Sequence, residues 1–567
     1  MSRIRCLAAV AAGLTLLSGG AAFAADPPRL TTPVHITKDD LNPGRTYSSP
    51  NFAVDPSNPM VIVGAFAELR SRRCSIIRTA DGGETWTRLD PNTSSPSPQS
   101  YPNCNSNPRG TFQAQPAFGR GGSLYLALNG WDTQDGGVGG NPSIIVSKST
   151  NLGDTWQPVV ARDNRGKTGE QQEADRPVTG IAVDRKSGSA DILYVGASRR
   201  SPGFSGANAL PNQPIVIVST DGGKTFSEPV NLAESAFTDG GARQRAFSSA
   251  TTAPPSPNAP TTTVPAPGTR AATPDQAANF GGFGPSITVD DKGTVYAVWP
   301  ATYANLNPRP AGAIFVSKST DKGKTWTTSQ VTPHDFKIGS FVTVAWSPEG
   351  GPEGTLHAVS DGYENPAIAG YTDIYYYRST DGGRTWSERR NVTDDDPAKV
   401  YAQVYPNIAV APDGRVEIAW FDTRDDPGTR ANDVYMVTST DNGATWGKNL
   451  RVTDRSIDRN IGVFANNADV NAPPGLAATK AFTLVGWDDT RNGDAVGQAQ
   501  DLYAANVQYE EIGGGTSNAT KIALAGVVGL VIVGLALLGV SMLTKRGGDG
   551  TPPTTEPRVP PAKAKVS

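Results

Sequence analysis

Two short stretches in the C-terminal third of the chain place the same three residue types at the same spacing. Trp420, Asp422 and Arg424 form one W-x-D-x-R pattern, and Trp487, Asp489 and Arg491 form the other. A flat indole beside an oriented carboxylate and guanidinium suits a pocket for a sugar or a carboxylate ligand. The alternative is structural, because an Asp and an Arg two residues apart can also form an ion pair at the rim of a sheet.

The composition argues against other kinds of site. The chain has three histidines, His35, His334 and His357, so a His-based catalytic triad or a His-rich zinc site is hard to build. We therefore expect no metal and no cofactor. The formal net charge of −3, with both signs mixed along the chain, gives no polybasic face. Nucleic acid is not an expected partner.

The N-terminus predicts secretion. Residues 1–24 combine two early arginines, an apolar run and the small-residue pattern Ala22-Phe23-Ala24, which is typical of a cleaved signal peptide. Beyond this segment the cysteines are Cys74 and Cys104. In an oxidising compartment an even pair of cysteines indicates one disulfide, so we expect Cys74 and Cys104 to be bonded.

The C-terminus predicts a membrane anchor. Residues 522–543 are uncharged and predominantly apolar, which is long enough for a helix that crosses a bilayer. Lys545 and Arg546 follow directly, so the positive-inside rule places the bulk of the chain outside the cell. We expect a linker over 510–521, a single span, and a disordered cytosolic tail over 544–567.

A nine-residue motif, RSTDGGRTW at 378–386, recurs five more times with small changes. Its fourth positions are Asp81, Asn151, Asp221, Asp321, Asp381 and Asp441. Alternating apolar runs joined by short turns precede each copy, as in 286–299 and 407–422. A period of two indicates strands. A catalytic site is needed once, whereas six copies indicate the turn of a structural repeat, in which Asp accepts hydrogen bonds from its own backbone.

The repeat predicts an all-β fold. Each unit supplies four strands, and four-stranded units repeated radially form a β-propeller over residues 25–509. Seven strand pairs predict seven blades, with residues 33–39 as the closing N-terminal strand. A six-bladed ring with one degenerate unit is the alternative. Residues 251–276 are rich in Pro, Thr and Ala, so we expect a disordered insertion there.

The nine-residue motif resembles the Asp-box of sialidases and of related bacterial neuraminidase-repeat propellers, over residues 78–446. Ala65-Phe66-Ala67-Glu68-Leu69-Arg70 is similar to a second sialidase signature, which implies roles for Glu68 and Arg70. Ser48 stands where the resemblance implies a carboxylate-clamping Arg, and no acid/base Asp follows Arg70. Arg176 could supply an Arg from another unit. The catalytic residues of an enzyme are therefore unassigned.

The ends of second strands gather on the propeller face opposite the motif. We expect this face to bind a glycan or glycoconjugate, outside the cell, on a membrane-anchored sialidase-like propeller. The candidate ligand-binding residues are Glu68, Arg70, Arg176, Trp420, Asp422, Arg424, Trp487, Asp489 and Arg491. One alternative is an exo-sialidase-type glycoside hydrolase with a rearranged catalytic set. The other is a cell-surface platform that binds proteins.

Overall fold

The computed structural model divides the chain into two units, of which one, Asp26–Glu510, contains the described residues. These are residues 28–69, 73–89, 114–130, 143–163, 176–199, 213–233, 280–282, 284–303, 313–332, 337–363, 372–396, 399, 401–426, 430–462 and 472–509. The predicted signal peptide, insertion, linker, membrane span and tail lie outside them. Within these ranges no helix is long and apolar enough to cross a membrane.

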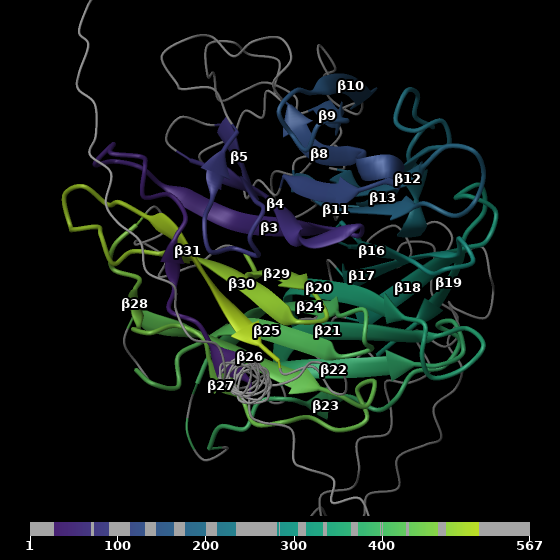
Figure 1. Ribbon diagram of the computed structural model, residues 1–567. Coiled ribbons are helices and arrows are strands. Elements are labelled where there is room, and N and C mark those ends of the chain that lie inside the picture. The colour runs from purple at the N-terminus through teal and green to yellow at the C-terminus, as the bar shows by residue number, and fades with distance from the viewer. Residues whose placement is uncertain are drawn as a thin grey trace, which may run out of the picture. The chain divides into compact units, whose positions relative to one another are not determined.

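Seven sheets surround one axis. The first strand of each sheet contacts the first strand of the next, and the seventh contacts the first, so these inner strands form a closed ring (Figure 1). They are β3 (Tyr47–Asp55), β7 (Gln115–Phe118), β11 (Arg176–Asp184), β16 (Ser286–Val289), β20 (Lys337–Ser347), β24 (Gln403–Val410) and β29 (Gly475–Ala478). The seven-bladed propeller predicted from the sequence is confirmed, and the six-bladed alternative is wrong.

Each blade is an antiparallel meander from the axis outward. The second strands are β4 (Asn58–Glu68), β8 (Leu124–Gly130), β12 (Ile192–Arg199), β17 (Val295–Tyr303), β21 (Thr355–Tyr363), β25 (Val416–Asp422) and β30 (Phe482–Asp489). The third strands are β5 (Arg73–Thr79), β9 (Ser143–Ser149), β13 (Gln213–Ser219), β18 (Ala313–Ser319), β22 (Asp373–Ser379), β26 (Ala431–Ser439) and β31 (Asp501–Gln508).

The outer strands are short. In the first six blades they are β6 (Thr87–Arg88), β10 (Gln157–Arg162), β14 (Val230–Asn231), β19 (Thr327–Gln330), β23 (Arg390–Asn391) and β27 (Leu450–Arg451). Two strands are additional, β15 (Phe280–Gly282) beside β17 and β28 (Ile457–Asp458) beside β26. In the seventh blade the N-terminal strands β1 (Arg29–Leu30) and β2 (Val34–His35) pair with β31. The two ends of the propeller therefore share one sheet.

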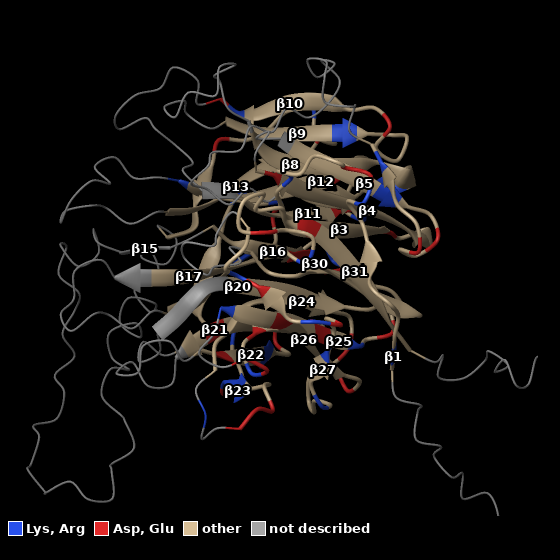
Figure 2. Cartoon of the chain, turned by 90° about the vertical axis from the view of Figure 1, so that its left-hand side faces the viewer, with Lys and Arg blue, Asp and Glu red and all other residues tan. Residues whose placement is uncertain are grey.

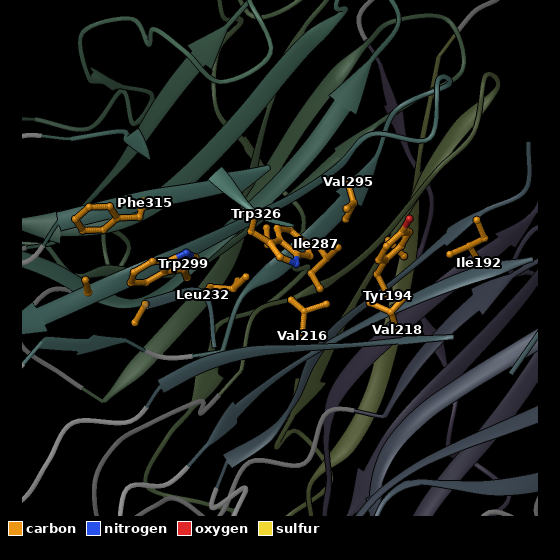
Figure 3. Packing of buried hydrophobic residues seen from close by; sticks show 14 of the residues in the cluster. Ile192, Tyr194, Val216, Val218, Leu232, Ile287, Val295, Trp299, Phe315 and Trp326 are labelled. Atoms are coloured by element: carbon orange, nitrogen blue, oxygen red, sulfur yellow. The ribbon is translucent and has the colours of Figure 1, made fainter. Parts of the chain in front are cut away.

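The core lies between blades because strand side chains alternate between the two faces of each sheet. Between blades three and four, Tyr194 and Val216 face Ile287, Trp299 and Trp326 (Figure 3). Trp299 is fully buried, and its ring stacks on that of Phe315 with 4.9 Å between centroids. This continuous apolar packing on both faces explains why the second strands are rich in apolar residues.

The six repeated motifs are the turns between third and fourth strands, and they define the Asp-box face. In the fourth blade, Asp321 accepts hydrogen bonds from the Ser319 hydroxyl (2.8 Å), the Thr325 hydroxyl (2.6 Å) and the Thr325 N–H (2.9 Å). The two bonds from Thr325 lower the pKa of Asp321 to about 2. Gly323 has a φ of 78°, which a residue with a Cβ resists. Each carboxylate is thus occupied by its own turn.

A buried histidine joins two neighbouring blades beside these turns. His357 Nδ1 lies 2.7 Å from the Tyr376 hydroxyl, and Nε2 lies 3.0 Å from the Ser347 hydroxyl. Ser347 in turn donates to Asn442 of the sixth-blade turn (2.7 Å). Burial, together with the nearby Arg378, lowers the pKa of His357 to about 3. The imidazole is therefore neutral in the folded protein at neutral pH.

We expect this histidine to destabilise the propeller in mild acid. The unfolded chain takes up a proton near pH 6.5 whereas the folded chain does not, so the stability falls as the pH drops from 6.5 toward 3. The loss attributable to His357 is about 2 kcal/mol by pH 5. Denaturant titrations of wild type and His357→Gln at pH 7.5 and pH 5 test this. Equal pH dependence in the two proteins would refute it.

Candidate functional site

The face opposite the Asp-boxes, here called the loop face, carries the connections from second to third strands and from fourth strands to the next blade. In the sixth blade, Trp420 at the end of β25 is fully buried, and its indole N–H donates to Asp422 (2.8 Å). Asp422 also accepts bonds from the backbone N–H (2.8 Å) and Nε (2.9 Å) of Arg424. The indole belongs to the inter-blade core and offers no exposed ring for stacking.

The seventh blade repeats this geometry at the end of β30. Trp487 is fully buried and donates to Asp489 (3.0 Å). Asp489 accepts bonds from the backbone N–H (2.9 Å) and Nη2 (2.8 Å) of Arg491. The two W-x-D-x-R patterns are therefore one structural unit built twice.

The outer ends of these arginines join adjacent blades. Arg424 Nη1 donates to Asp394 (2.7 Å), and Arg491 binds Asp454 through both Nη atoms (2.6 and 3.2 Å). In Figure 2, Lys and Arg residues (blue) lie among Asp and Glu residues (red) around β25, β26 and β27. Asp394 and Asp454 each follow the outer strand of the preceding blade. Each Arg is thus a clasp between blades.

Glu68 occupies the same place in the first blade. In the strand register Glu68 of β4 lies opposite Arg73 of β5. In the same way Asp422 lies opposite Asp433, and Asp489 lies opposite Asp501. Phe66, two residues earlier, is buried like Trp420. The stretch that resembles a sialidase signature is therefore also a copy of the aromatic-x-acid-x-Arg repeat, which an alignment of the second strands could have found. Arg70 lies outside the described residues.

The other sequence candidates are partly described. Ser48 is buried, and its hydroxyl lies 3.4 Å from that of Ser49. Arg176 begins β11, where its backbone pairs with Ser198. Cys74 is disulfide-bonded and buried in β5, and Cys104 lies outside the described residues. In the described part of the chain no three His, Cys, Asp or Glu side chains are grouped to hold a metal ion.

One cluster on the loop face was not identified from the sequence. Arg459, in the connection between blades six and seven, is 2% exposed. It donates from Nε to Asn432 (3.0 Å) and from Nη1 to Asp488 (2.9 Å). Gln500 donates to the same Asp488 oxygen (2.8 Å) and to the carbonyl of Tyr47 (2.8 Å). The cluster joins blades six, seven and one.

The electrostatics of this cluster are unusual. Burial raises the pKa of the Asp488 carboxyl, and the guanidinium of Arg459 opposes this rise. Arg459 Nη2 is buried and has no hydrogen-bond partner among the described residues. A buried N–H without a partner costs about 1–3 kcal/mol. No motif surrounds Arg459, which lies in a loop without periodicity, so sequence patterns could not single it out.

One copy of the repeated nine-residue motif matches a known protein family. Residues 377–388 match the family described as BNR/Asp-box repeat. No curated protein matches the chain. A protein of unknown function from Dyadobacter fermentans has a similar structure, with 14% identity over 86% of this chain and 100% of that chain and a TM-score of 0.42. The Hadza microbial sialidase Hz136 has 16% identity over 80% of this chain and 73% of that chain, with a TM-score of 0.38.

A mutant of Trypanosoma rangeli sialidase that displays trans-sialidase activity is also similar, with 13% identity over 74% of this chain and 58% of that chain and a TM-score of 0.39. The Asp-box geometry is present at all six repeats, with a hydroxyl two residues earlier bonded to each Asp or Asn. Six of the seven blades carry these turns. The chain is therefore a seven-bladed β-propeller with six Asp-box turns, one of which, at residues 377–388, matches the BNR/Asp-box repeat.

Proposed function

We propose that the protein is a membrane-anchored, extracellular propeller that binds an acidic glycan or glycoconjugate on its loop face. The observation that carries the proposal is the buried Nη2 of Arg459, which has no hydrogen-bond partner within the described part of the chain. A carboxylate or sulfate group would supply the missing acceptor, and charge-assisted hydrogen bonds of this kind are strong. Asp488 and Asn432 hold the guanidinium in one orientation, so little conformational entropy would be lost on binding.

The anchor is supported by the sequence. Residues 522–543 have the length and composition of a membrane span, and the signal peptide pattern at 1–24 supports export. The loop face would then be available to ligands outside the cell. The two Arg clasps, Arg424 and Arg491, would support the site by fixing blades six and seven, without contacting the ligand.

The conservative variant Arg459→Lys tests the proposal. It retains a positive charge beside Asp488 and removes the planar fork that contains Nη2. On an array of sialylated, uronate-containing, sulfated and neutral glycans, we expect wild type to bind acidic glycans and the variant to bind them about 10- to 100-fold more weakly. Thermal denaturation of both proteins checks that the variant is folded.

The matched control is Arg455→Lys, four residues earlier in the same connection, where the side chain is exposed. It should leave binding unchanged. Undiminished binding by Arg459→Lys would contradict the proposed site. An array without any bound glycan would favour the protein-binding alternative, and turnover of a fluorogenic sialoside would favour a hydrolase.

A further inference from the structure

The Asp-box face is unevenly charged. Its turns in blades three and four carry six exposed cations, Arg185, Lys186, Lys224, Lys292, Lys322 and Lys324, here called the basic patch. At the Asp-box position of Lys224 and Lys324, the fifth blade has Arg384, whereas the first, second and sixth blades have Glu84, Asp154 and Ala444. Positive charge at this position therefore occurs in the three consecutive blades three to five, and in blades three and four the turns between first and second strands add Arg185, Lys186 and Lys292.

The members of the basic patch lie close together. Lys322 Nζ is 3.9 Å from the position that a Cβ on Gly188 would take, which places it beside Arg185 and Lys186 of the third blade. Lys186 lies 3.8 Å from Asp291, an exposed and weak ion pair. Among the described residues Lys224, Lys322 and Lys324 form no ion pair. The patch thus has several cations that are open to an anionic partner.

The chain leaves the propeller on this same face. Third strands run toward the Asp-box turns, and β31, the last of them, ends at Gln508. Tyr509 is then fixed by a backbone bond to Ala481 (3.0 Å) and by its hydroxyl 2.9 Å from that of Thr438. From residue 510 to the predicted span at 522 the chain can reach at most about 40 Å.

We propose that the basic patch contacts anionic phospholipid headgroups of the membrane that anchors the chain. This inference rests on the membrane anchor of the proposed function. A short tether makes the contact intramolecular, so a weak attraction suffices to orient the propeller. Near an anionic bilayer each Lys or Arg strengthens binding about fivefold. The loop face would then be directed away from the membrane.

The test uses residues 26–510, which contain every strand of the closed ring and lack the anchor. The variant combines Lys224→Ala, Lys322→Asn and Lys324→Ala, which are the residues that the sixth Asp-box has at these positions. Lys322 has a φ of 63°, and Asn442, its equivalent, has 58°, so the backbone tolerates the change. Co-sedimentation is measured with vesicles of phosphatidylcholine containing 30% phosphatidylglycerol, and with phosphatidylcholine alone.

We expect wild type to bind the anionic vesicles, to lose this binding in 0.5 M salt, and to ignore neutral vesicles. The patch variant should bind about 100-fold more weakly. The matched control, Lys38→Ala, Lys399→Ala and Arg455→Ala, removes three exposed charges from the loop face and should bind like wild type.

Three results would overturn the inference. They are equal binding by wild type and the patch variant, equal loss in the control variant, and capture of soluble polyphosphate with no binding to vesicles. None of them involves the glycan site, because vesicle binding is measured without a glycan and without the anchor. If the basic patch does not bind the vesicles, the outcome of the Arg459 experiment is therefore unaffected.

Discussion

Replacing Asp501 with alanine is expected to lower the free energy of unfolding of the propeller by about 3–5 kcal/mol. Its carboxylate is completely buried at the start of β31. It accepts bonds from Thr37 (3.0 Å), from Nε (2.5 Å) and Nη2 (2.8 Å) of Arg45, and from Asn492 (2.9 Å). Thr37 and Arg45 belong to the N-terminal segment, so the substitution leaves the donors that close the ring without an acceptor.

Denaturant-induced unfolding of residues 26–510 measures this effect. Asp454→Ala provides the comparison, because Asp454 also pairs with an Arg but is 46% exposed, and exposed pairs contribute about 1 kcal/mol or less. If the two variants lose the same stability, the ring is not held closed through Asp501. A loss confined to Asp501→Ala would identify the N-terminal segment as a structural part of the seventh blade.

Arg415→Ala is expected to have an effect of the same size. Arg415 donates to Glu417 (2.8 Å), to Asp413 (2.7 Å) and to the carbonyl of Thr479 (2.7 Å). Glu417 is completely buried, and burial raises its pKa while Arg415 opposes the rise. Removing the guanidinium leaves a buried carboxylate without its cation, which costs about 3–5 kcal/mol.

The double variant Arg415→Met with Glu417→Leu separates charge from packing. Replacing both members of a buried pair by apolar residues of similar size is often close to neutral. We therefore expect the double variant to regain most of the stability that Arg415→Ala loses, as measured by the denaturant midpoint. If the double variant is as unstable as Arg415→Ala, packing of Arg415 over the ring of Tyr509, 3.7 Å from its centroid, dominates instead.

The architecture could be predicted because it depends on local patterns. Period-two alternation marks strands such as β25, and the six Asp-box turns fix their order, so the number of blades follows by counting. The closing strand could be predicted because Ile36-Thr37 repeats the Val452-Thr453 that directly follows the sixth outer strand, β27. In both copies the Thr hydroxyl donates to a buried Asp, Asp501 or Asp433.

The site could be predicted only in part. The sequence placed Asp422 and Arg424 on the loop face, but alternation along a strand does not show which side chains a neighbouring blade covers. Trp420 is buried against the neighbouring fifth blade, so this large side chain contributes to the inter-blade core. Arg459 was missed because its partners, Asn432 and Asp488, lie in two strands of different blades, β26 and β30. Contacts between a loop and strands of different blades depend on the closed ring and produce no periodic pattern in the sequence.

The arrangement of β31 has a mechanical consequence. This strand lies between β30 on one side and β1 and β2 on the other, and it ends where the chain leaves the propeller. A pull on that end acts along the strand, so the hydrogen bonds from Phe482↔Gln508 to Asp489↔Asp501, and those to β1 and β2, share the load in shear. Bonds loaded together resist force better than bonds peeled one at a time, and forced unfolding is limited by the rate of that rupture. The propeller should therefore stay folded under a pulling force that would unfold a terminal hairpin.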